Sequence, residues 1–538
     1  MFRGLQTWRH LFVSILVFVL LVGCTASPQQ TTSEPQANPG SSAAGKGTLV
    51  ISALIEPSTI DVQQATWIDS ANTQIYDPLL NYDLNGKLSP GLAERYEVSE
   101  DGKVWTFFLR KDVLFHSGEP LTAEAIKKTI ERFIQISPVK ELAGPVEKVE
   151  AVDEHTVKLY FSEAFAPFSS VAAAPFFGAL DPKRLAEMGD KFGDNPSGTG
   201  PYLFEKHDRG SSITYKRNPV YNWGTESAKN RAAPYVDQVV FRFVKDDDTR
   251  ILEFKKGTIH ILQNVPTNYV QELQNTPGVE ILKVPETGIK YLGFNNKKPI
   301  FQDTRVKQAI SMAIDRDPII QVALGGFAQP VFGPLPPTIP FHSERIESMA
   351  RQEYAYNVEK AKALLAEAGW TDSNGDGIVE KDGKPFSVEL LLPNEPAFQR
   401  VAQIVQNQLK AIGIDLKLAV TETATVRDRT SKASHDMALL YYGYSDPDVL
   451  YLMFHSKMSI RTHFSTPELD LLLEKGRRTT NEKERMNVYE EIQELLIKEA
   501  PWVPLYAEEN IFATRGIEGF KLHPFQEFFI LQDVKLTK

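Results

Sequence analysis

The sequence predicts an α/β fold, because strand-like and helix-like segments alternate along most of it. The clearest unit lies at residues 386–420, where FSVELLLP is typical of a strand, FQRVAQIVQNQLKAIG of an amphipathic helix and IDLKLAV of a further strand. A strand, a helix and a strand in so short a segment form a βαβ unit, which implies parallel pairing and a sheet covered by helices. Gly413 suits the position that follows a helix end.

Other segments repeat these two patterns. Apolar and polar residues alternate at 156–161, which predicts a half-buried strand, and 239–244, 291–295 and 437–444 are further strand candidates. One apolar face predicts helices over 122–134, 305–314, 358–368 and 482–498. We find no internal repeat.

The N-terminus resembles an export signal. Basic residues around Arg9 precede an apolar run at 11–22, which is too short for an ordinary membrane-spanning helix. The run ends in LVGC, which resembles the bacterial lipobox. That resemblance implies a signal peptide at 1–23, cleavage before Cys24 and a lipid on its sulfur. The alternative is an ordinary signal peptide followed by a chance cysteine.

Cys24 is the only cysteine, so the chain can form no internal disulfide. Residues 24–46 are rich in Ser, Thr, Gln, Pro and Gly and predict a flexible tether. The folded part begins near Gly47. It is longer than one hydrophobic core usually covers, which predicts two or three lobes.

The charge balance and the motifs exclude several classes of function. The net charge is −10, and without the two arginines of the signal peptide it is 57 minus 69, or −12. This acidity disfavours nucleic acid as a partner. The chain lacks GxSxG, HExxH, a Walker loop and a glycine fingerprint between a strand and a helix. We therefore expect no enzyme and no cofactor, although a hydrolase with an activated nucleophile remains an alternative.

A series of motifs carries a family resemblance. Residues 75–126 contain IYDPLL, PGLAERY, SEDGKVWTFFLR and FHSGEP, followed by GTGPY, RNPVY, YLGFNNKKPIFQDTRVKQAISMAIDRDPII and LLAEAGW. In this order they resemble the peptide, nickel and oligopeptide solute-binding proteins of ABC importers, from Gly47 to about Phe512. Most of these motifs are turns, hairpins and helices, so they identify the fold and do not bind the ligand.

The resemblance implies two α/β lobes that face each other across a cleft, the periplasmic-binding-protein-like fold of class II. Residues 47–84, 200–290 and 506–538 would form the main lobe, 85–199 an inserted subdomain, and 291–505 the second lobe. The crossings near Lys290 and Pro504 would act as hinges.

The same resemblance implies the function and the partners. The protein would capture a small molecule or peptide and deliver it to an ABC permease and its ATPase. It would act as a lipid-anchored monomer at the extracytoplasmic face of the bacterial membrane, in the periplasm of a Gram-negative cell. Sensing of the ligand through a membrane receptor is an alternative to transport.

Two regions supply candidate ligand-binding residues. Trp67 is an aromatic residue among polar neighbours, which suits a cleft wall, although packing under a loop is the alternative. The second region follows the strand at 437–444, where ligands of open α/β sheets bind. Its candidates are Tyr441, Tyr442, Gly443, Tyr444, Asp446 and Asp448.

Gly443 departs from the family pattern. In peptide-binding members a carboxylate four residues before Pro447 pairs with the peptide's α-amino group, and here that position is Gly443. Asp446 and Asp448 could substitute for it, or could be turn and helix-cap residues. A metal chelate held by Arg427, Arg429 or Arg461, or an oligosaccharide stacked on aromatic rings, are further alternatives. Nickel itself is also an alternative ligand, but His455 and His463 are eight positions apart and would meet in one direct metal site only by accident of the fold.

Asp372, Asn374 and Asp376 resemble the first half of an EF-hand loop. Position 12 of that loop, where a bidentate Glu is expected, is Gly383. We therefore interpret the loop as a polar turn, with calcium as the alternative.

Overall fold

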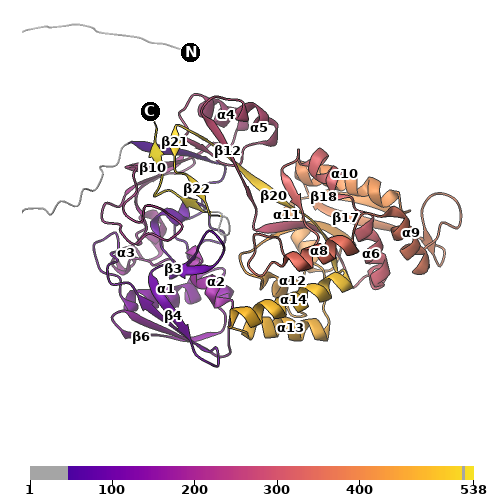
Figure 1. Ribbon diagram of the computed structural model, residues 1–538, viewed down its shortest axis with the longest axis horizontal. Helices are drawn as coiled ribbons and strands as arrows, with labels where there is room; N and C mark the ends of the chain where they lie inside the picture. Colours follow the sequence, from indigo (N-terminus) through magenta and orange to yellow (C-terminus); the bar gives the residue numbers. More distant parts are fainter. Residues whose placement is uncertain (1–46, 524–527, 538) are drawn as a thin grey trace, which may run out of the picture. The chain divides into compact units, whose positions relative to one another are not determined.

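The computed structural model describes residues 47–523 and 528–537 and has the predicted α/β class (Figure 1). The signal peptide at 1–23, the tether up to residue 46 and Cys24 lie outside the described residues. Within the described part, one large mixed sheet runs in the order β18-β17-β19-β13-β20-β11-β1-β10-β9-β8, and β12 and β14 also pair with β20.

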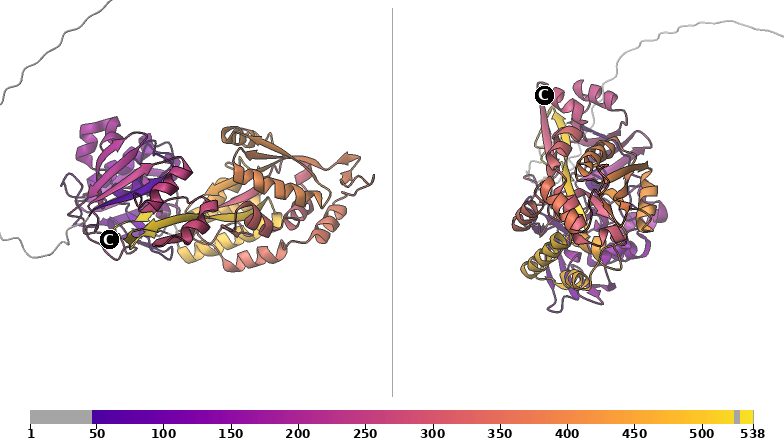
Figure 2. Two further views of the ribbon diagram at one scale, coloured as in Figure 1. Left: turned by 90° about the horizontal axis from the view of Figure 1, so that it is seen from above. Right: turned by 90° about the vertical axis from the view of Figure 1, so that its right-hand side faces the viewer.

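The strands of this sheet come from widely separated parts of the chain, from β1 near the start of the described residues to β20 near their end. β20 (Trp502–Arg515) is the longest and is seen as one continuous strand in the left view of Figure 2. The others are β1 (Thr48–Ala53), β8 (Tyr202–Asp208), β9 (Ser212–Arg217), β10 (Gln238–Phe243), β11 (Ile261–Leu262), β12 (Val279–Pro285), β13 (Gly288–Phe294), β14 (Ala328–Pro330), β17 (Ser387–Pro393), β18 (Asp415–Thr421) and β19 (Met437–Gly443).

The predicted βαβ unit is confirmed. β17 and β18 pair in parallel, and α10 (Pro396–Lys410) connects them and packs on both. The buried face of α10 carries apolar side chains at helical spacing, because only that face meets the sheet; they are Val401, Val405 and Leu409. Gly413 has φ +83°, the left-handed conformation that suits glycine after a helix.

The remaining helices of residues 291–505 surround this part of the sheet, and those predicted at 305–314, 358–368 and 482–498 are confirmed. They enclose two hydrophobic clusters that share the strands of the sheet. The helices are α6 (Thr304–Met312), α7 (Arg316–Pro318), α8 (Glu344–Glu353), α9 (Val358–Glu367), α11 (Thr423–Ser431), α12 (Val449–Phe454), α13 (Pro467–Arg478) and α14 (Glu482–Glu499). A short hairpin joins β15 (Glu380–Lys381) to β16 (Lys384–Pro385).

Residues 85–199 contain a separate antiparallel sheet in the order β4-β5-β7-β6. Its strands are β4 (Ala93–Val98), β5 (Val104–Leu109), β6 (Val146–Asp153) and β7 (Thr156–Phe161), accompanied by α1 (Ala123–Ile136), α2 (Phe168–Ala172) and α3 (Pro182–Met188). Gly102, at φ +71°, forms the predicted turn between β4 and β5. We call residues 85–199 the inserted subdomain.

Smaller elements complete residues 47–290 and the C-terminus. The helices are α4 (Asp247–Lys255) and α5 (Thr267–Gln274). The short strands form the pairs β2 (Leu80–Tyr82) with β3 (Leu88–Pro90), β21 (Ile517–Glu518) with β24 (Lys535–Leu536), and β22 (Lys521–Leu522) with β23 (Phe529–Ile530). The predicted GTGPY turn passes directly over Ile75, where a Cβ on Gly200 would lie 2.6 Å from the carbonyl carbon of Ile75.

β20 changes partners along its length. Its first residues pair with β13 and β14, and its later residues pair with β11 and β12. The register with β13 shifts between Lys290 and Tyr291, opposite Tyr506 and Pro504. Such bulges bend a strand locally. The two residues predicted as hinges, Lys290 and Pro504, therefore stand at an irregularity of the sheet, and the lobe boundaries stay a prediction.

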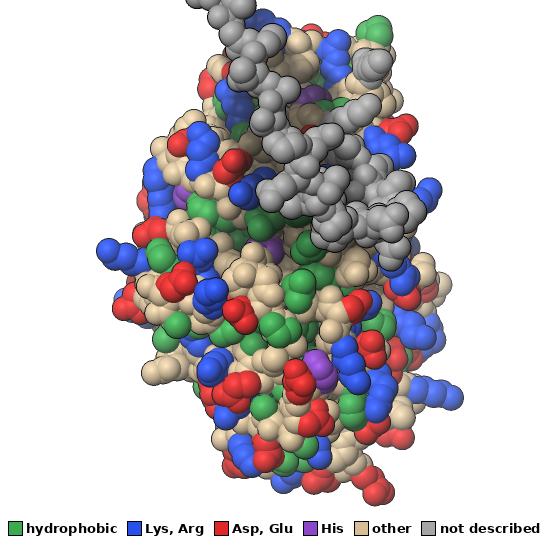
Figure 3. Space-filling view, turned by 90° about the vertical axis from the view of Figure 1, so that its left-hand side faces the viewer, with side chains coloured by type: hydrophobic (Ala, Val, Ile, Leu, Met, Phe, Trp, Pro, Cys, Tyr) green, Lys and Arg blue, Asp and Glu red, His purple; other side chains and the backbone are tan. Residues whose placement is uncertain are grey.

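No helix in the described ranges has the length and apolarity needed to cross a membrane. Figure 3 shows Lys and Arg side chains interspersed with Asp and Glu on the face that it presents.

Candidate functional site

The candidate segment 441–448 begins at the end of β19, which lies between β17 and β13. β19 runs parallel to β17 and antiparallel to β13. The segment therefore leaves the sheet at the edge where the parallel strands β17 and β18 also end. The strand prediction at 437–444 is confirmed, and α12 follows directly after Asp448.

Tyr441 is half-buried and faces a lysine of the neighbouring strand. Lys290 stands opposite Tyr441 in the register of β13 and β19, and its Nζ lies 4.4 Å from the centre of the Tyr441 ring. Such a distance is typical of a cation–π interaction. The carbonyl oxygen of Tyr441 accepts a hydrogen bond from Nη1 of Arg461 at 2.9 Å. Two cations thus contact this residue.

Lys290 is itself buried and pairs with two half-buried carboxylates. Its Nζ lies 2.7 Å from Oε2 of Glu286 and 3.4 Å from Oε2 of Glu508. Burial raises the pKa of Glu508, a shift that Lys290 opposes and Glu286 reinforces. Lys290 is not among the binding residues predicted from the sequence. The signal was a lysine in the otherwise apolar strand GIKYLGF, whose residues are all buried.

Tyr442 points to the opposite side of β19 and belongs to the core. It is buried, its hydroxyl donates to the carbonyl oxygen of Pro334 at 2.7 Å, and its ring stacks on Trp502 at 5.7 Å between ring centres. The side chain is fully engaged within the protein. We therefore keep only its neighbours as candidates for ligand contact.

Gly443 pairs with Gly288 across β13 and β19. A Cβ added at Gly443 would collide with the phenol oxygen of Tyr441. The space in which a side chain at position 443 would begin is therefore occupied by the hydroxyl of Tyr441.

Asp446 is buried and has a cation partner within the protein. Its carboxylate oxygens accept from Nη2 and Nη1 of Arg485 at 2.8 and 3.2 Å, and Arg485 is also buried. Burial would lower the pKa of Arg485, but the adjacent Asp446 more than compensates and raises it. Asp446 also accepts the backbone N–H of Asp448 at 2.8 Å, which is the turn chemistry considered from sequence.

Asp448 is buried beside Arg477, with Nε 3.0 Å from Oδ1, a charge contact without the alignment of a hydrogen bond. Burial raises the pKa of Asp448 to about 7, and Arg477 opposes the shift. Burial also raises the pKa of Tyr444. Segment 441–448 therefore contains several polar side chains that are buried away from water, namely Tyr444, Asp446 and Asp448.

Trp67 is 67% exposed. The alternative that it packs under a loop is therefore wrong. Its ring is thus exposed enough to meet a ligand or a partner.

The basic and histidine candidates are dispersed. Arg429 pairs with Glu389, and Arg427 is exposed. His455 lies 3.4 Å from Glu474, whereas His463 contacts the carbonyl oxygen of Thr430 at 2.7 Å. Of the three arginines considered for a metal chelate, only Arg461 is placed against the candidate segment.

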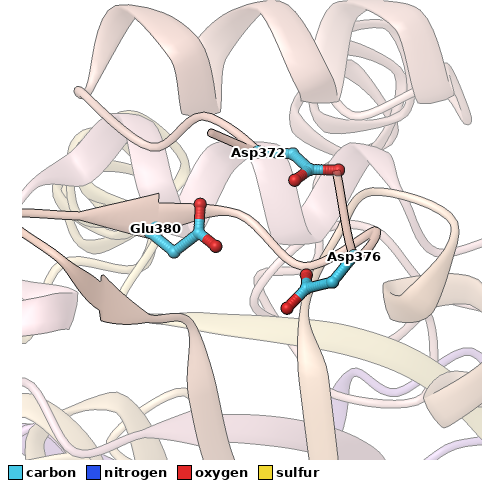
Figure 4. A group of neighbouring side chains, drawn as sticks. All are labelled: Asp372, Asp376 and Glu380. Atoms are coloured by element: carbon cyan, nitrogen blue, oxygen red, sulfur yellow. The ribbon is translucent and has the colours of Figure 1, made fainter. Parts of the chain in front are cut away.

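The acidic loop brings three carboxylates together. Ligand oxygens of Asp372, Asp376 and Glu380 lie within 4.8 Å of one another, and Figure 4 shows the three groups facing a common space. The loop uses some of these oxygens itself, because Asp372 accepts the N–H groups of Gly375 and Gly377 at 2.7 and 3.0 Å. Asn374 donates to Asp376 and Glu380. A polar turn accounts for all of these contacts.

A small cavity of about 90 Å³ lies beside Gln74, Asp77 and His523. At roughly 30 Å³ per water molecule it has room for about three waters. Asp77, which lines it, already accepts from Thr199, Tyr221 and Trp223. The cavity is too small for a peptide.

Comparisons with known proteins show which family the sequence and the fold resemble. The family model for bacterial extracellular solute-binding proteins, family 5 (middle region), matches residues 87–459. The oligopeptide-binding protein AppA of Bacillus subtilis (strain 168) is 27% identical over 98% of this chain and 98% of its own length. The structure of AppA with a nonapeptide has a TM-score of 0.72 at 25% identity and covers 92% of this chain and 100% of AppA.

Two other relatives differ in ligand. The glutathione-binding protein GsiB of Salmonella choleraesuis (strain SC-B67) is 28% identical over 87% of this chain and 90% of its own length. The structure of NikZ from Campylobacter jejuni with Ni(L-His) has a TM-score of 0.74 at 25% identity, over 91% of this chain and 99% of NikZ.

The family match covers more than half of the chain, and the structural matches extend over nearly all of the described part. The fold is therefore the two-lobed fold of these proteins, and the protein acts by binding rather than by catalysis. The chain belongs to family 5 of the bacterial extracellular solute-binding proteins.

Proposed function

We propose that the protein captures a peptide between its two lobes and delivers it to the permease of an ABC importer. The observation that carries this proposal is the similarity to the oligopeptide-binding protein AppA over 98% of both chains. The half-buried ring of Tyr441, with Lys290, Glu286 and Glu508 beside it, supplies aromatic and charged groups suited to a peptide backbone. Trp67 is proposed as a further cleft residue.

A metal chelate is the second candidate ligand. Arg461 and Lys290 place two cations against Tyr441, and cations suit the carboxylates of a chelator. The similarity to NikZ, whose structure contains Ni(L-His), supports the same candidate.

The proposed location is the extracytoplasmic face of the membrane, with Cys24 carrying the lipid and residues 24–46 acting as a tether. The protein would act there as a monomer. A chain held near the permease delivers its ligand without diffusing away.

Mass spectrometry of the ligand that co-purifies with natively expressed protein tests the function. We expect peptides, and a solution of those peptides should reduce the radius of gyration in small-angle scattering and raise the melting temperature. A metal chelate in the mass spectrum would select the second candidate. A saturating ligand that changed neither quantity would contradict closure of the lobes.

A further inference from the structure

The carboxylate of Asp446 has no acceptor position left for a ligand. Oδ1 accepts from the backbone N–H of Asp448 and from Arg485, each at 2.8 Å. Oδ2 accepts from Arg485 at 3.2 Å and from the hydroxyl of Ser170. A carboxylate offers about four lone-pair sites, and all four are used here. Asp446 is only 2% exposed, so its role lies within the protein.

Ser170 reaches Asp446 from the inserted subdomain. It lies in α2 and is separated from Asp446 by 276 positions in the sequence. Its hydroxyl oxygen accepts from the hydroxyl of Tyr82 at 2.7 Å, which directs the Ser170 proton to Asp446. Tyr82, Ser170, Asp446 and Arg485 thus form one chain of hydrogen bonds, and all four residues are buried.

Further contacts form a row beside this chain. The backbone N–H of Ala166 donates to the carbonyl oxygen of Arg477 at 2.7 Å. The Arg477 guanidinium lies 5.1 Å from the centre of the Phe165 ring. At the exposed end, Glu163 pairs with Arg478 at 3.0 Å. Residues 163–170 therefore contact the C-terminal end of α13, and also Asp446 just before α12, at several independent points.

The two ends of segment 441–448 contact different parts of the protein. Its first residues, Tyr441 and Gly443, are paired in the sheet beside Lys290, whereas Asp446 and Asp448 make the contacts with Arg485 and Arg477 next to the inserted subdomain. Only a few residues separate the two ends, so a movement of Ser170 away from Asp446 loosens the segment that carries the candidate binding residues.

We infer that Asp446 is a positioning residue, which together with Arg485 and Ser170 fixes segment 441–448 against the inserted subdomain. The inference rests on the proposed function in one respect: the contact would order the binding segment when the two lobes close around a ligand. Asp446 does not pair with the ligand.

Crosslinking of the ligand-free protein tests the contact. Cys24→Ala removes the only cysteine, and Glu163→Cys with Arg478→Cys then places two thiols at the exposed end of the row, where both side chains are 54% exposed. The rate of crosslinking by a short bismaleimide reports how often the two elements meet. Ser170→Ala should lower this rate about tenfold or more, the effect of one charge-assisted hydrogen bond.

Ser169→Ala is the matched control, because its hydroxyl donates to Ala166 in its own subdomain. Hydrogen exchange gives the second readout: the amides of 441–448 should exchange faster in Ser170→Ala and not in Ser169→Ala, at equal melting temperature. If Ser170→Ala does not fold, Tyr82→Phe is used in its place. This substitution removes the hydroxyl that donates to Ser170, so the expected decrease in the crosslinking rate is smaller. Equal crosslinking and exchange in the variant and the control would overturn the inference. Because no ligand is present, failure to find a peptide would overturn the proposed function and leave this result unaffected.

Discussion

Asp446 and Arg485 form a buried ion pair in which both side chains are less than 5% exposed. Removing one member of such a pair leaves the other charged and desolvated. The pair therefore ties the position of segment 441–448 to α14, which carries Arg485.

Substitution of Arg485 by Met should lower the free energy of unfolding by about 3–5 kcal/mol, because it leaves Asp446 without its cation. Denaturant unfolding measures the loss. Arg345→Met is the control: Arg345 pairs with Glu490 at 2.7 Å but is 55% exposed, so its loss should cost about 1 kcal/mol or less. Equal effects of the two substitutions would contradict the assignment.

Gly443→Ala should destabilise the protein by about 1–3 kcal/mol, because the added methyl group meets the hydroxyl of Tyr441. Tyr441→Phe removes that hydroxyl and should reduce the cost of the added methyl. A double-mutant cycle by urea unfolding measures this coupling. Additive effects would show that Tyr441 does not fill the space at Gly443.

The stability should depend on pH through Asp448, whose pKa burial raises to about 7. Below about pH 4 the carboxyl is protonated in both states. Between about pH 4 and 7 the unfolded chain releases this proton and the folded chain keeps it, so the free energy of unfolding falls as pH rises. As the pH rises from about 4 to 7, the free energy of unfolding of the wild type should therefore decrease relative to that of Asp448→Asn. Parallel curves for the two proteins would exclude a raised pKa.

Cys24→Ala should move the protein from the detergent phase to the aqueous phase in a phase-partition assay. One acyl chain binds membranes only marginally, so stable retention requires the two-chain anchor proposed at Cys24. Equal partitioning of the variant and the wild type would argue against lipidation.

Local patterns predicted much of the fold. The βαβ unit at 386–420 was identifiable because the periodicities of β17, α10 and β18 arise within each element. The turn at Gly102 and the helix over 482–498 followed from equally local signals. Trp67 was undecided from sequence, because the same residues suit a loop that covers an aromatic ring and one that exposes it.

The site was harder to predict. Asp446 had the features of a ligand-binding carboxylate, and its partners are 39 and 276 positions away in the sequence. Arg485 left one usable signal. It falls on the same helical face as Val488, Tyr489 and Ile492, so the helical spacing alone places an arginine among buried residues, where its charge requires an acid. Ser170 left none, because a serine in a short helix has no distinguishing pattern.

The arrangement of β20 has a consequence for biosynthesis. Because residues 502–515 complete the sheet beside both β11 and β13, a ribosome must finish almost the entire chain before either edge is closed. Until then the nascent protein presents unpaired strand edges, which favour aggregation. A truncation before Trp502 should therefore leave the large sheet incomplete beside β11 and β13, whereas the separate sheet of residues 85–199 contains no strand from that part of the chain.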